Sequence, residues 1–443
     1  MNSVKTKPLT TIAFKTLGCK LNFTETEEIA KKFRLDTYKR VDSNERADIY
    51  VFNTCSVTEN ADKKFKNLVR KANKLNKNAF IAVVGCYAQL KTSEISKFKG
   101  VDLVLGASEK FNLDQFIDKR NKEKISKTYS CSIDSFKNFD SSFSDTNSSR
   151  TRSFLKIQDG CDYKCTYCTI PLARGRSRSD SIENVVKNVK KIVSKGFKEI
   201  VLTGINLGDF GNLNGKLKKK NNALIDLLNE LEEISGVNRY RISSIEPNLL
   251  SDEIIMFVSQ SKKFLPHFHI PLQSGSDQVL RDMKRRYKST FYINLVSKIK
   301  KVMPDASIGA DVIVGFPTET HDKFLDSYNF LDNLDVSYLH VFKYSDRENT
   351  ISYNIIDKVT EKDKILRSQV LRDLSLKKKT SFYENNLYKL HNVLWESENK
   401  KGYIHGFTSN YIKVRHFWNP LMANSIQKKY LSGIDKEGYA RIA

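Results

Sequence analysis

Short apolar runs alternate with amphipathic stretches along the first part of the chain. The runs are rich in β-branched residues, as expected of buried strands, and the stretches between them carry apolar residues at helical spacing. Alternation of strands and helices predicts a parallel, doubly wound α/β sheet. We expect strands over 11–17, 49–54, 80–85 and 101–105, separated by helices over 24–33, 61–75 and 92–98.

A second alternating segment follows a polar stretch. Residues 121–150 are rich in Ser, Asp and Lys and predict a linker or a disordered insertion, in which Cys131 has no evident partner. Beyond it, an apolar stripe over 182–193 has helical period and is followed by Gly196, a typical helix end. Further strands predict a partial TIM-like (βα)6 barrel, whose sites lie at the carboxyl ends of the strands. These strands are expected over 154–158, 199–202, 240–244, 267–272, 308–314 and 338–342.

The pattern changes again near residue 383. Short apolar runs with Gly and Asn turns predict antiparallel strands and a small β-barrel. Such barrels often bind oligonucleotides, although this one could instead be a structural cap on the main barrel. The strands are expected over 393–395, 402–407, 411–414 and 438–442. We therefore expect domains over 9–120, 151–380 and 381–443, with a linker over 121–150.

Composition narrows the class of protein. A length of 443 residues is too great for one ordinary core. The net charge of +24 favours a polyanionic partner, and RNA is the first candidate. The alternative is that the charge only reflects an amino-acid composition biased towards Lys and Asn along the whole chain. Seven scattered cysteines favour metal ligation in a reduced, cytoplasmic protein over a disulfide scaffold. No apolar signal region precedes Gly18, and the longest apolar stretch, 79–88, is too short for a membrane span.

Cys161, Cys165 and Cys168 form a C-x3-C-x2-C run. Three close thiolates can hold three irons of a [4Fe–4S] cluster and leave the fourth iron open, whereas electron carriers fill all four positions with Cys. A structural zinc site is the alternative, but zinc usually takes two separated ligand pairs, and no fourth Cys or His follows nearby. The spacing resembles the signature of radical S-adenosylmethionine (SAM) enzymes, in which the open iron binds SAM and SAM is cleaved to a 5′-deoxyadenosyl radical.

Three further cysteines, Cys19, Cys55 and Cys86, each follow a predicted strand directly. Loops after parallel strands gather at one edge of the sheet, where ligands bind. Three thiols at that edge could hold a second [4Fe–4S] cluster, with Gly18 and Gly85 allowing close backbone approach, or they could be three unrelated buried thiols.

Together these segments resemble the methylthiotransferases of the radical SAM superfamily over nearly the whole chain. The resemblance implies an N-terminal domain with an auxiliary cluster, a radical SAM barrel and a C-terminal TRAM barrel that binds RNA. One SAM would donate a methyl group to sulfur on the auxiliary cluster, and another would supply the radical that activates C2 of an adenine. The implied partners are a tRNA anticodon loop, a low-potential electron donor and a sulfur source. The implied ligands are Cys19, Cys55 and Cys86 for the auxiliary cluster and Cys161, Cys165 and Cys168 for the SAM cluster.

Three branches of this family modify isopentenyl-adenosine in tRNA, threonylcarbamoyl-adenosine in tRNA, or an aspartate of ribosomal protein S12. The motifs at 16–22, 53–58, 158–163 and 243–247 are similar to the threonylcarbamoyl branch, and the Pro-containing loop expected of the S12 branch is absent after Cys19. We therefore expect conversion of N6-threonylcarbamoyladenosine next to the anticodon to its 2-methylthio derivative. The alternatives are an S12 aspartate methylthiotransferase and a non-catalytic iron–sulfur RNA-binding protein.

One loop departs from the family pattern. Residues 345–351, SDRENTI, replace a loop that often carries Gly or Pro after the Arg and Pro-Ala after the Thr. The departure concerns the shape of this loop and not the cysteines.

Polar residues at predicted strand ends are candidate contacts for SAM or substrate, although they could also be barrel packing and turn residues. The motifs PLQSG at 271–275 and GADVIVGFP at 309–317 are the best of these segments. Arg174, Arg176 and Arg178 follow the cluster loop and could face phosphate or the SAM carboxylate, or form a solvated basic loop. The candidate SAM-binding residues are Thr203, Gly204, Ser244, Glu246, Gln273, Ser274 and Asp311.

Overall fold

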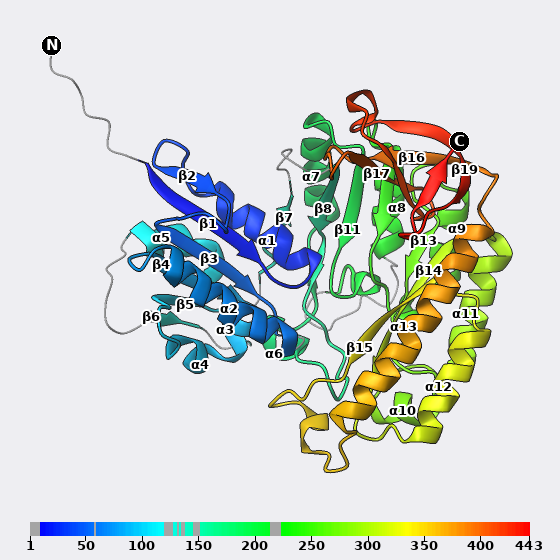
Figure 1. The fold of residues 1–443 in the computed structure, drawn as a ribbon, viewed down its shortest axis with the longest axis horizontal. Helices are drawn as coiled ribbons and strands as arrows, with labels where there is room; N and C mark the ends of the chain where they lie inside the picture. Colours follow the sequence, from blue (N-terminus) through cyan, green and yellow to red (C-terminus); the bar gives the residue numbers. More distant parts are fainter. Residues whose placement is uncertain are drawn as a thin grey trace. The chain divides into compact units, whose positions relative to one another are not determined.

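The computed structural model of the protein describes residues 9–56, 59–118, 127–130, 133, 138–144, 151–212 and 223–443. Cys131 and much of the predicted linker lie outside these residues. The chain divides into two compact units, which are described separately (Figure 1). Unit 1 comprises Met1–Ser144, Gly160–Asp162 and Thr169–Arg176, and unit 2 comprises Asp145–Asp159, Tyr163–Cys168 and Ser177–Ala443.

Unit 1 is built, within its described residues, on a parallel six-stranded sheet of order β2-β1-β3-β4-β5-β6. The four predicted strands are confirmed, and β4 has the predicted bounds. The prediction missed β2 and β6, which are short, polar edge strands without an apolar run. The strands are β1 (Thr10–Thr16), β2 (Tyr38–Val41), β3 (Ile49–Thr54), β4 (Phe80–Gly85), β5 (Leu103–Leu105) and β6 (Lys127–Tyr129). A further short strand, β7 (Ser142–Phe143), lies beside α1.

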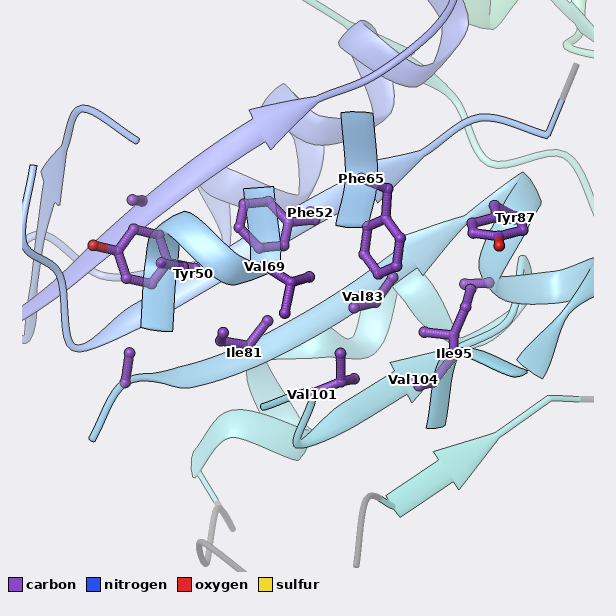
Figure 2. Packing of buried hydrophobic residues seen from close by; sticks show 14 of the residues in the cluster. Tyr50, Phe52, Phe65, Val69, Ile81, Val83, Tyr87, Ile95, Val101 and Val104 are labelled. Carbon is purple, nitrogen blue, oxygen red and sulfur yellow. The ribbon is translucent and has the colours of Figure 1, made fainter. Parts of the chain in front are cut away.

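Helices cover both faces of this sheet, which confirms the doubly wound arrangement. Alternate residues of a strand point to opposite faces, so each strand contributes to two cores. On one face, Phe65 and Val69 of α2 pack among strand residues such as Phe52 and Val83 (Figure 2). On the other face, Ile29 of α1 packs with the strand residues of opposite parity. The helices are α1 (Lys20–Lys31), α2 (Glu59–Leu75), α3 (Cys86–Leu90), α4 (Thr92–Ser96), α5 (Leu113–Asp118) and α6 (Ile170–Arg174).

Unit 2 contains the predicted (βα)6 arrangement. Strands β8, β11 and β12 pair in parallel, as do β13, β14 and β15, and single parallel bridges, including Ser244 to His269, join the two sets. All six predicted strands are confirmed within a few residues. They are β8 (Arg152–Lys156), β11 (Glu199–Thr203), β12 (Arg239–Ile242), β13 (His267–His269), β14 (Ser307–Val314) and β15 (Tyr338–Lys343), and a short antiparallel pair is formed by β9 (Gln158–Asp159) and β10 (Arg178–Ser179).

Amphipathic helices follow these strands. The apolar stripe of α7 is buried, and the helix ends as predicted at Gly196, which has φ +82° and donates its N–H to the carbonyl of Val193 at 2.9 Å. The long α13 packs along β15 (Figure 1). The helices are α7 (Ile182–Ser194), α8 (Ala223–Glu233), α9 (Asp252–Gln260), α10 (Asp277–Asp282), α11 (Ser289–Val302), α12 (His321–Asn333) and α13 (Glu361–Glu384).

The end of the chain forms a closed barrel of order β16-β17-β18-β20-β19 around the fully buried Trp395. The prediction missed β19, whose sequence IQKKYLSGI shows no clean apolar alternation because most of its residues are partly or fully solvated. Arg239 of β12 anchors the barrel by donating to the carbonyls of Phe407 at 3.1 Å and Asn392 at 2.7 Å. The strands are β16 (Leu390–Trp395), β17 (Tyr403–Thr408), β18 (Lys413–Phe417), β19 (Ile426–Ile434) and β20 (Ala440–Ile442).

Among the described residues, none of the helices has the length and apolar character that crossing a membrane requires.

Candidate functional site

Three cysteines lie at the carboxyl edge of the sheet of unit 1. Cys19 directly precedes α1, Cys55 follows β3, and Cys86 begins α3 directly after β4. Because β1, β3 and β4 are neighbours in the sheet, their loops meet at one edge, as predicted. From β1 the chain first adds β2 on one side and then returns to add β3 on the other side. In doubly wound sheets, ligands bind at the carboxyl edge between two such strands. Cys19 is exposed, Cys55 is half-buried and Cys86 is buried, so the thiols extend from the surface inwards.

Two glycines with a left-handed backbone directly precede Cys19 and Cys86. Gly18 and Gly85 both have φ of +99°, in the left-handed region that favours glycine. A Cβ atom on Gly18 would lie 2.8 Å from Cys55 Sγ, and one on Gly85 would collide with the Oδ1 atom of Asn53. Gly18 therefore permits the loop that carries Cys19 to come close to Cys55.

A buried charge cluster lies beside the thiols. Glu25 of α1 accepts two hydrogen bonds from the guanidinium of Arg174, at 3.0 and 3.2 Å, and its carboxylate is 2.7 Å from Lys110 Nζ. All three side chains are almost completely buried, at 0 to 3% exposure. Burial raises the pKa of the Cys86 thiol, whereas the Arg174 cation lowers it. We call Glu25, Arg174 and Lys110 the Glu25 cluster.

Asn22 connects the Glu25 cluster to the cysteine loops. Its side-chain oxygen accepts from Arg174 at 2.5 Å, and its amide donates to the carbonyls of Leu17 at 2.9 Å and Thr54 at 3.0 Å. Since Leu17 and Thr54 lie next to the Cys19 and Cys55 loops, Asn22 fixes both.

For Arg174 the alternative of a solvated loop was wrong, because this side chain is almost completely buried. It is buried in unit 1 against a residue 149 positions earlier in the chain. Sequence analysis also missed Glu25 and Lys110. One signal was available for Glu25, since it stands between Leu21 and Ile29 at four-residue spacing, on the buried face of α1.

The donor set at this edge fits an iron–sulfur cluster. Among the described residues, no three His, Cys, Asp or Glu side chains are grouped as for one metal ion. A [4Fe–4S] cluster takes each thiolate on a different iron, so its ligands do not have to converge on one point. Thiolates are the ligands of such clusters, and cations nearby favour the thiolate form.

The C-x3-C-x2-C loop begins at a glycine that no other residue can replace without strain. Gly160 has φ of +70°, and a Cβ atom on it would collide with the carbonyl of Arg176. Cys161 donates its N–H to the carbonyl of Gly175 at 3.1 Å. Further along, the N–H of Cys168 donates to the carbonyl of Cys165 at 3.1 Å, so these two residues share one turn.

The other two arginines of this region differ from each other. Arg176 is exposed and forms an ion pair with Asp162 at 3.2 Å, as expected of a solvated loop. Arg178 is buried and pairs with the buried Asp159 at 3.2 Å, so for Arg178 the expectation of a solvated loop was wrong.

Arg285 connects one of the loop cysteines to a predicted SAM contact. Its Nη1 atom is 3.3 Å from Cys165 Sγ, and its Nη2 atom forms an ion pair with Glu246. Burial raises the pKa values of both Cys165 and Glu246, and the Arg285 cation lowers them. The sequence prediction missed Arg285, and the basic run at 284–286 was the only signal for it.

A chain of hydrogen bonds connects two other predicted contacts. Ser244 Oγ lies 2.8 Å from His269 Nδ1, and His269 Nε2 lies 2.7 Å from Asp311 Oδ1. The three residues lie at the carboxyl end of β12, on β13 and on β14, so the fold brings Ser244 and Asp311 together through His269. His269 lies within a predicted strand but was not recognised as part of the site.

Two candidates are engaged in packing instead. The hydroxyl of Thr203 donates to the carbonyl of Val201 at 3.2 Å, and Ser274 Oγ is 2.9 Å from Ser327 Oγ of α12. Both side chains are buried, which corresponds to the alternative of barrel packing.

The last two candidates act through the backbone. Gln273 has φ of +74° and forms a bridge to Val312 of β14. A Cβ atom on Gly204 would lie 3.0 Å from Gln158 Oε1. This oxygen accepts hydrogen bonds from the backbone N–H groups of Ile205 and Asn206, both at 2.9 Å. Gln158 therefore fixes the loop after β11.

Comparison with known proteins agrees with this arrangement. Residues 11–106 match the family described as "Uncharacterized protein family UPF0004", and residues 155–331 match the Radical SAM superfamily. The fold is similar to that of the radical SAM methyltransferase TsrM from Kitasatospora setae, with a TM-score of 0.53 and 12% identity over 76% of this chain and 72% of that one.

Two relatives match nearly the whole chain. It is 40% identical to threonylcarbamoyladenosine tRNA methylthiotransferase MtaB from Bacillus subtilis, over 92% of this chain and 90% of that protein. It is 32% identical to tRNA-2-methylthio-N(6)-dimethylallyladenosine synthase from Clostridium tetani, over 90% of this chain and 88% of that protein. The chain therefore belongs to the radical SAM methylthiotransferase family, and it is an enzyme of methylthio transfer with SAM and [4Fe–4S] clusters as its cofactors.

Proposed function

We propose that this enzyme acts on tRNA and converts N6-threonylcarbamoyladenosine next to the anticodon to its 2-methylthio derivative. The observation that carries the proposal is the set of motifs at 16–22, 53–58, 158–163 and 243–247, which surround the cysteines and the barrel mouth. The identity of 40% to a relative named for threonylcarbamoyladenosine, against 32% to one named for dimethylallyladenosine, favours the same substrate.

The cysteines would hold the cofactors in two groups. When bound, the clusters and SAM supply radical chemistry, which an adenine C2–H bond requires because it offers neither an acidic proton nor a site for a nucleophile. In unit 1, Arg174 and Lys110 favour the thiolate form of the ligands, and Gly18 leaves room beside Cys55. The first group is Cys19, Cys55 and Cys86, and the second is Cys161, Cys165 and Cys168.

The barrel residues would bind and orient SAM. Ser244, Glu246 and Asp311 present polar atoms that His269 and Arg285 hold in place. Thr203, Gly204, Gln273 and Ser274 would instead shape the loops around the site, through the backbone and packing contacts described above.

Each predicted domain would have its own role, and the last would contribute to tRNA binding. These domains are expected over 9–120, 151–380 and 381–443. A low-potential electron donor and a sulfur source would act as partners, in the cytoplasm, where tRNA is found.

Substrate choice rests on the polarity of the group on N6 of the adenine. Threonylcarbamoyl presents a carboxylate and a hydroxyl, whereas isopentenyl presents only hydrocarbon. A pocket built for the polar group leaves its buried partners unpaired with the apolar one, which can cost a factor of roughly 10⁴ in specificity.

The substrate is tested with reconstituted enzyme and tRNA that carries threonylcarbamoyl, isopentenyl or no group on the adenosine 3′ to the anticodon. Mass spectrometry of the nucleosides should show methylthiolation of the first tRNA alone. Comparable modification of either other tRNA, or modification of S12 and not of tRNA, would contradict the assignment.

The cluster ligands are tested by iron content after anaerobic reconstitution. We expect about eight irons per chain from two four-iron clusters, and about half of that in either Cys-to-Ala triple variant. Only the Cys161, Cys165 and Cys168 triple variant should lose SAM cleavage. Cys131→Ala is the matched control and should keep all the iron; full iron in either triple variant would refute that ligand set.

A further inference from the structure

A cavity of about 530 Å³ lies in unit 2, where β15, α13 and the C-terminal barrel meet. Its volume falls within the range of roughly 300–1,000 Å³ that is usual for ligand sites. It is separate from the cysteines and from the predicted SAM contacts, none of which lines it. Nothing in the enzyme's proposed chemistry so far uses this space.

Three cations line the cavity: Arg372 and Lys379 from α13, and Lys413 from β18. Among the described residues no Asp or Glu lines it, and none of the three cations has an acidic partner within ion-pair distance. Elsewhere on α13, Arg367 pairs with Glu319 and Lys377 pairs with Asp332. Arg372 and Lys379 are seven residues apart and therefore share one face of the helix.

The positive charges affect one another. Burial and the neighbouring Lys413 both lower the pKa of Lys379, and Asp435, which does not line the cavity, raises it. Lys413 repels Lys379 because both side chains are cations, and an anion bound beside them would relieve this repulsion. The charge pattern thus favours an anionic occupant.

Aromatic rings also line the cavity. Tyr338, His340 and Phe342 occupy alternate positions of β15 and share one face of the strand. Phe342 is 40% exposed. Phe407 and Tyr411 of the C-terminal barrel continue the lining, with their rings stacked at 5.1 Å, and the Tyr411 ring lies 6.5 Å from that of Tyr338. Flat rings next to cations are the usual way in which proteins hold unpaired bases without reading their sequence.

The rings also lead from the cavity to the barrel interior. The His340 ring lies 5.1 Å from that of Tyr338 and 5.3 Å from that of His269, which bonds the predicted SAM contacts Ser244 and Asp311. An RNA strand that delivers a base to the barrel could therefore place a neighbouring nucleotide in the cavity.

We propose that this cavity binds a second, unstacked nucleotide of the substrate RNA, with its base against Phe342 and its phosphate between Arg372, Lys379 and Lys413. The proposal rests on the proposed action on tRNA, but the nucleotide is not the one that is modified. The site would hold the anticodon loop open while another base enters the barrel. RNA-binding proteins commonly capture loop bases in this way, on aromatic side chains.

The test uses the full chain and measures its affinity for the substrate tRNA and for a single-stranded RNA oligonucleotide at several salt concentrations. Phe342→Leu should weaken binding by about 5- to 140-fold if one base stacks there, whereas Phe342→Trp should keep it. Arg372→Gln combined with Lys379→Gln should lower the slope of log affinity against log salt by about 1.4, or roughly 0.7 for each lost charge. Ultraviolet crosslinking should join RNA to peptides that contain Phe342, Phe407 or Tyr411.

Lys301→Gln combined with Lys362→Gln is the matched control, because it removes two exposed charges of unit 2 that do not line the cavity. Its salt slope should change less than that of the cavity variant. Wild-type affinity and slope in both cavity variants, with crosslinks only elsewhere, would overturn the proposal. The proposal would also be overturned if the cavity variants bound RNA normally but no longer self-associated. In that case the occupant of the cavity would be a second copy of the chain.

The two proposals fail in different ways. If the enzyme methylthiolates tRNA but the cavity variants bind RNA normally, only the cavity proposal fails. If the oligonucleotide binds through the cavity but no tRNA is methylthiolated, the substrate assignment fails and the cavity proposal stands.

Discussion

Replacing Glu25 by Gln should destabilise unit 1 more than any other change in the Glu25 cluster. Gln has the shape of Glu but no charge, so Arg174 and Lys110 would remain buried around a neutral amide. Removal of one partner from a buried ion pair costs about 3–5 kcal/mol, a large part of the roughly 5–15 kcal/mol that stabilises a typical domain. Arg174→Met should cost less, because Lys110 stays 2.7 Å from the Glu25 carboxylate and leaves it with a buried cationic partner.

Hydrogen exchange with mass spectrometry measures this loss in peptides of β3 and β4 of the cluster-free protein. Glu28→Gln is the matched control on the same helix, because its ion pair with Lys31 is 30% exposed at both ends and should contribute no more than about 1 kcal/mol. The double variant Glu25→Gln with Arg174→Met should cost less than the sum of the two single changes. A cost below about 1 kcal/mol for Glu25→Gln, or a greater cost for Arg174→Met, would refute the central role of the carboxylate.

Three further outcomes are expected. Gly18→Ala should remove iron from the protein, because the new Cβ atom would displace Cys55 Sγ. Gly196→Ala is the control: this glycine also has a positive φ, +82°, but no atom lies within 4 Å of the new Cβ atom, so the variant should keep full iron and show only backbone strain. Equal iron loss in both variants would contradict this reasoning. Burial lowers the pKa of His391 and of His405 below the usual 6.5, so the C-terminal barrel should be fully stable above about pH 6.5 and lose stability as the pH falls further. Both tryptophans lie in that barrel, so urea unfolding followed by their fluorescence at pH 7 and pH 5 measures the loss, and His391→Gln with His405→Gln should flatten it. Arg285→Met should reduce SAM cleavage without changing tRNA affinity, because it removes the contact to Cys165 and the partner of Glu246; unchanged cleavage would show that Arg285 only packs.

The sequence predicted buried strands well and solvated ones poorly. Runs such as 49–54 and 80–85 are buried throughout, so composition alone identified them. Strand β19 was missed because most of its side chains are solvated and carry no apolar alternation. For the same reason the hydrophobic pattern did not predict β2 and β6, which lie at the two edges of a sheet.

The candidate site shows a similar division. The edge that gathers Cys19, Cys55 and Cys86 followed from strand order alone, because each thiol comes directly after a strand. Arg174 could not be placed, since nothing local in the sequence indicates that α6 packs in unit 1. His269 and Arg285 became recognisable only when their partners were close in space.

The separation of Glu25 and Arg174 along the chain has a consequence for biosynthesis. Ribosomes add about 5–20 residues per second, so Arg174 emerges roughly 7–30 s after Glu25, which lies 149 residues earlier. Lys110 emerges within that interval, so until Arg174 follows, Glu25 has only one of its two cationic partners. The three thiols of unit 1 are thus synthesised well before Arg174, the second of the two cations that favour their ionised form. Assembly of this edge, with whatever it binds, is therefore completed only after residue 174 has left the ribosome.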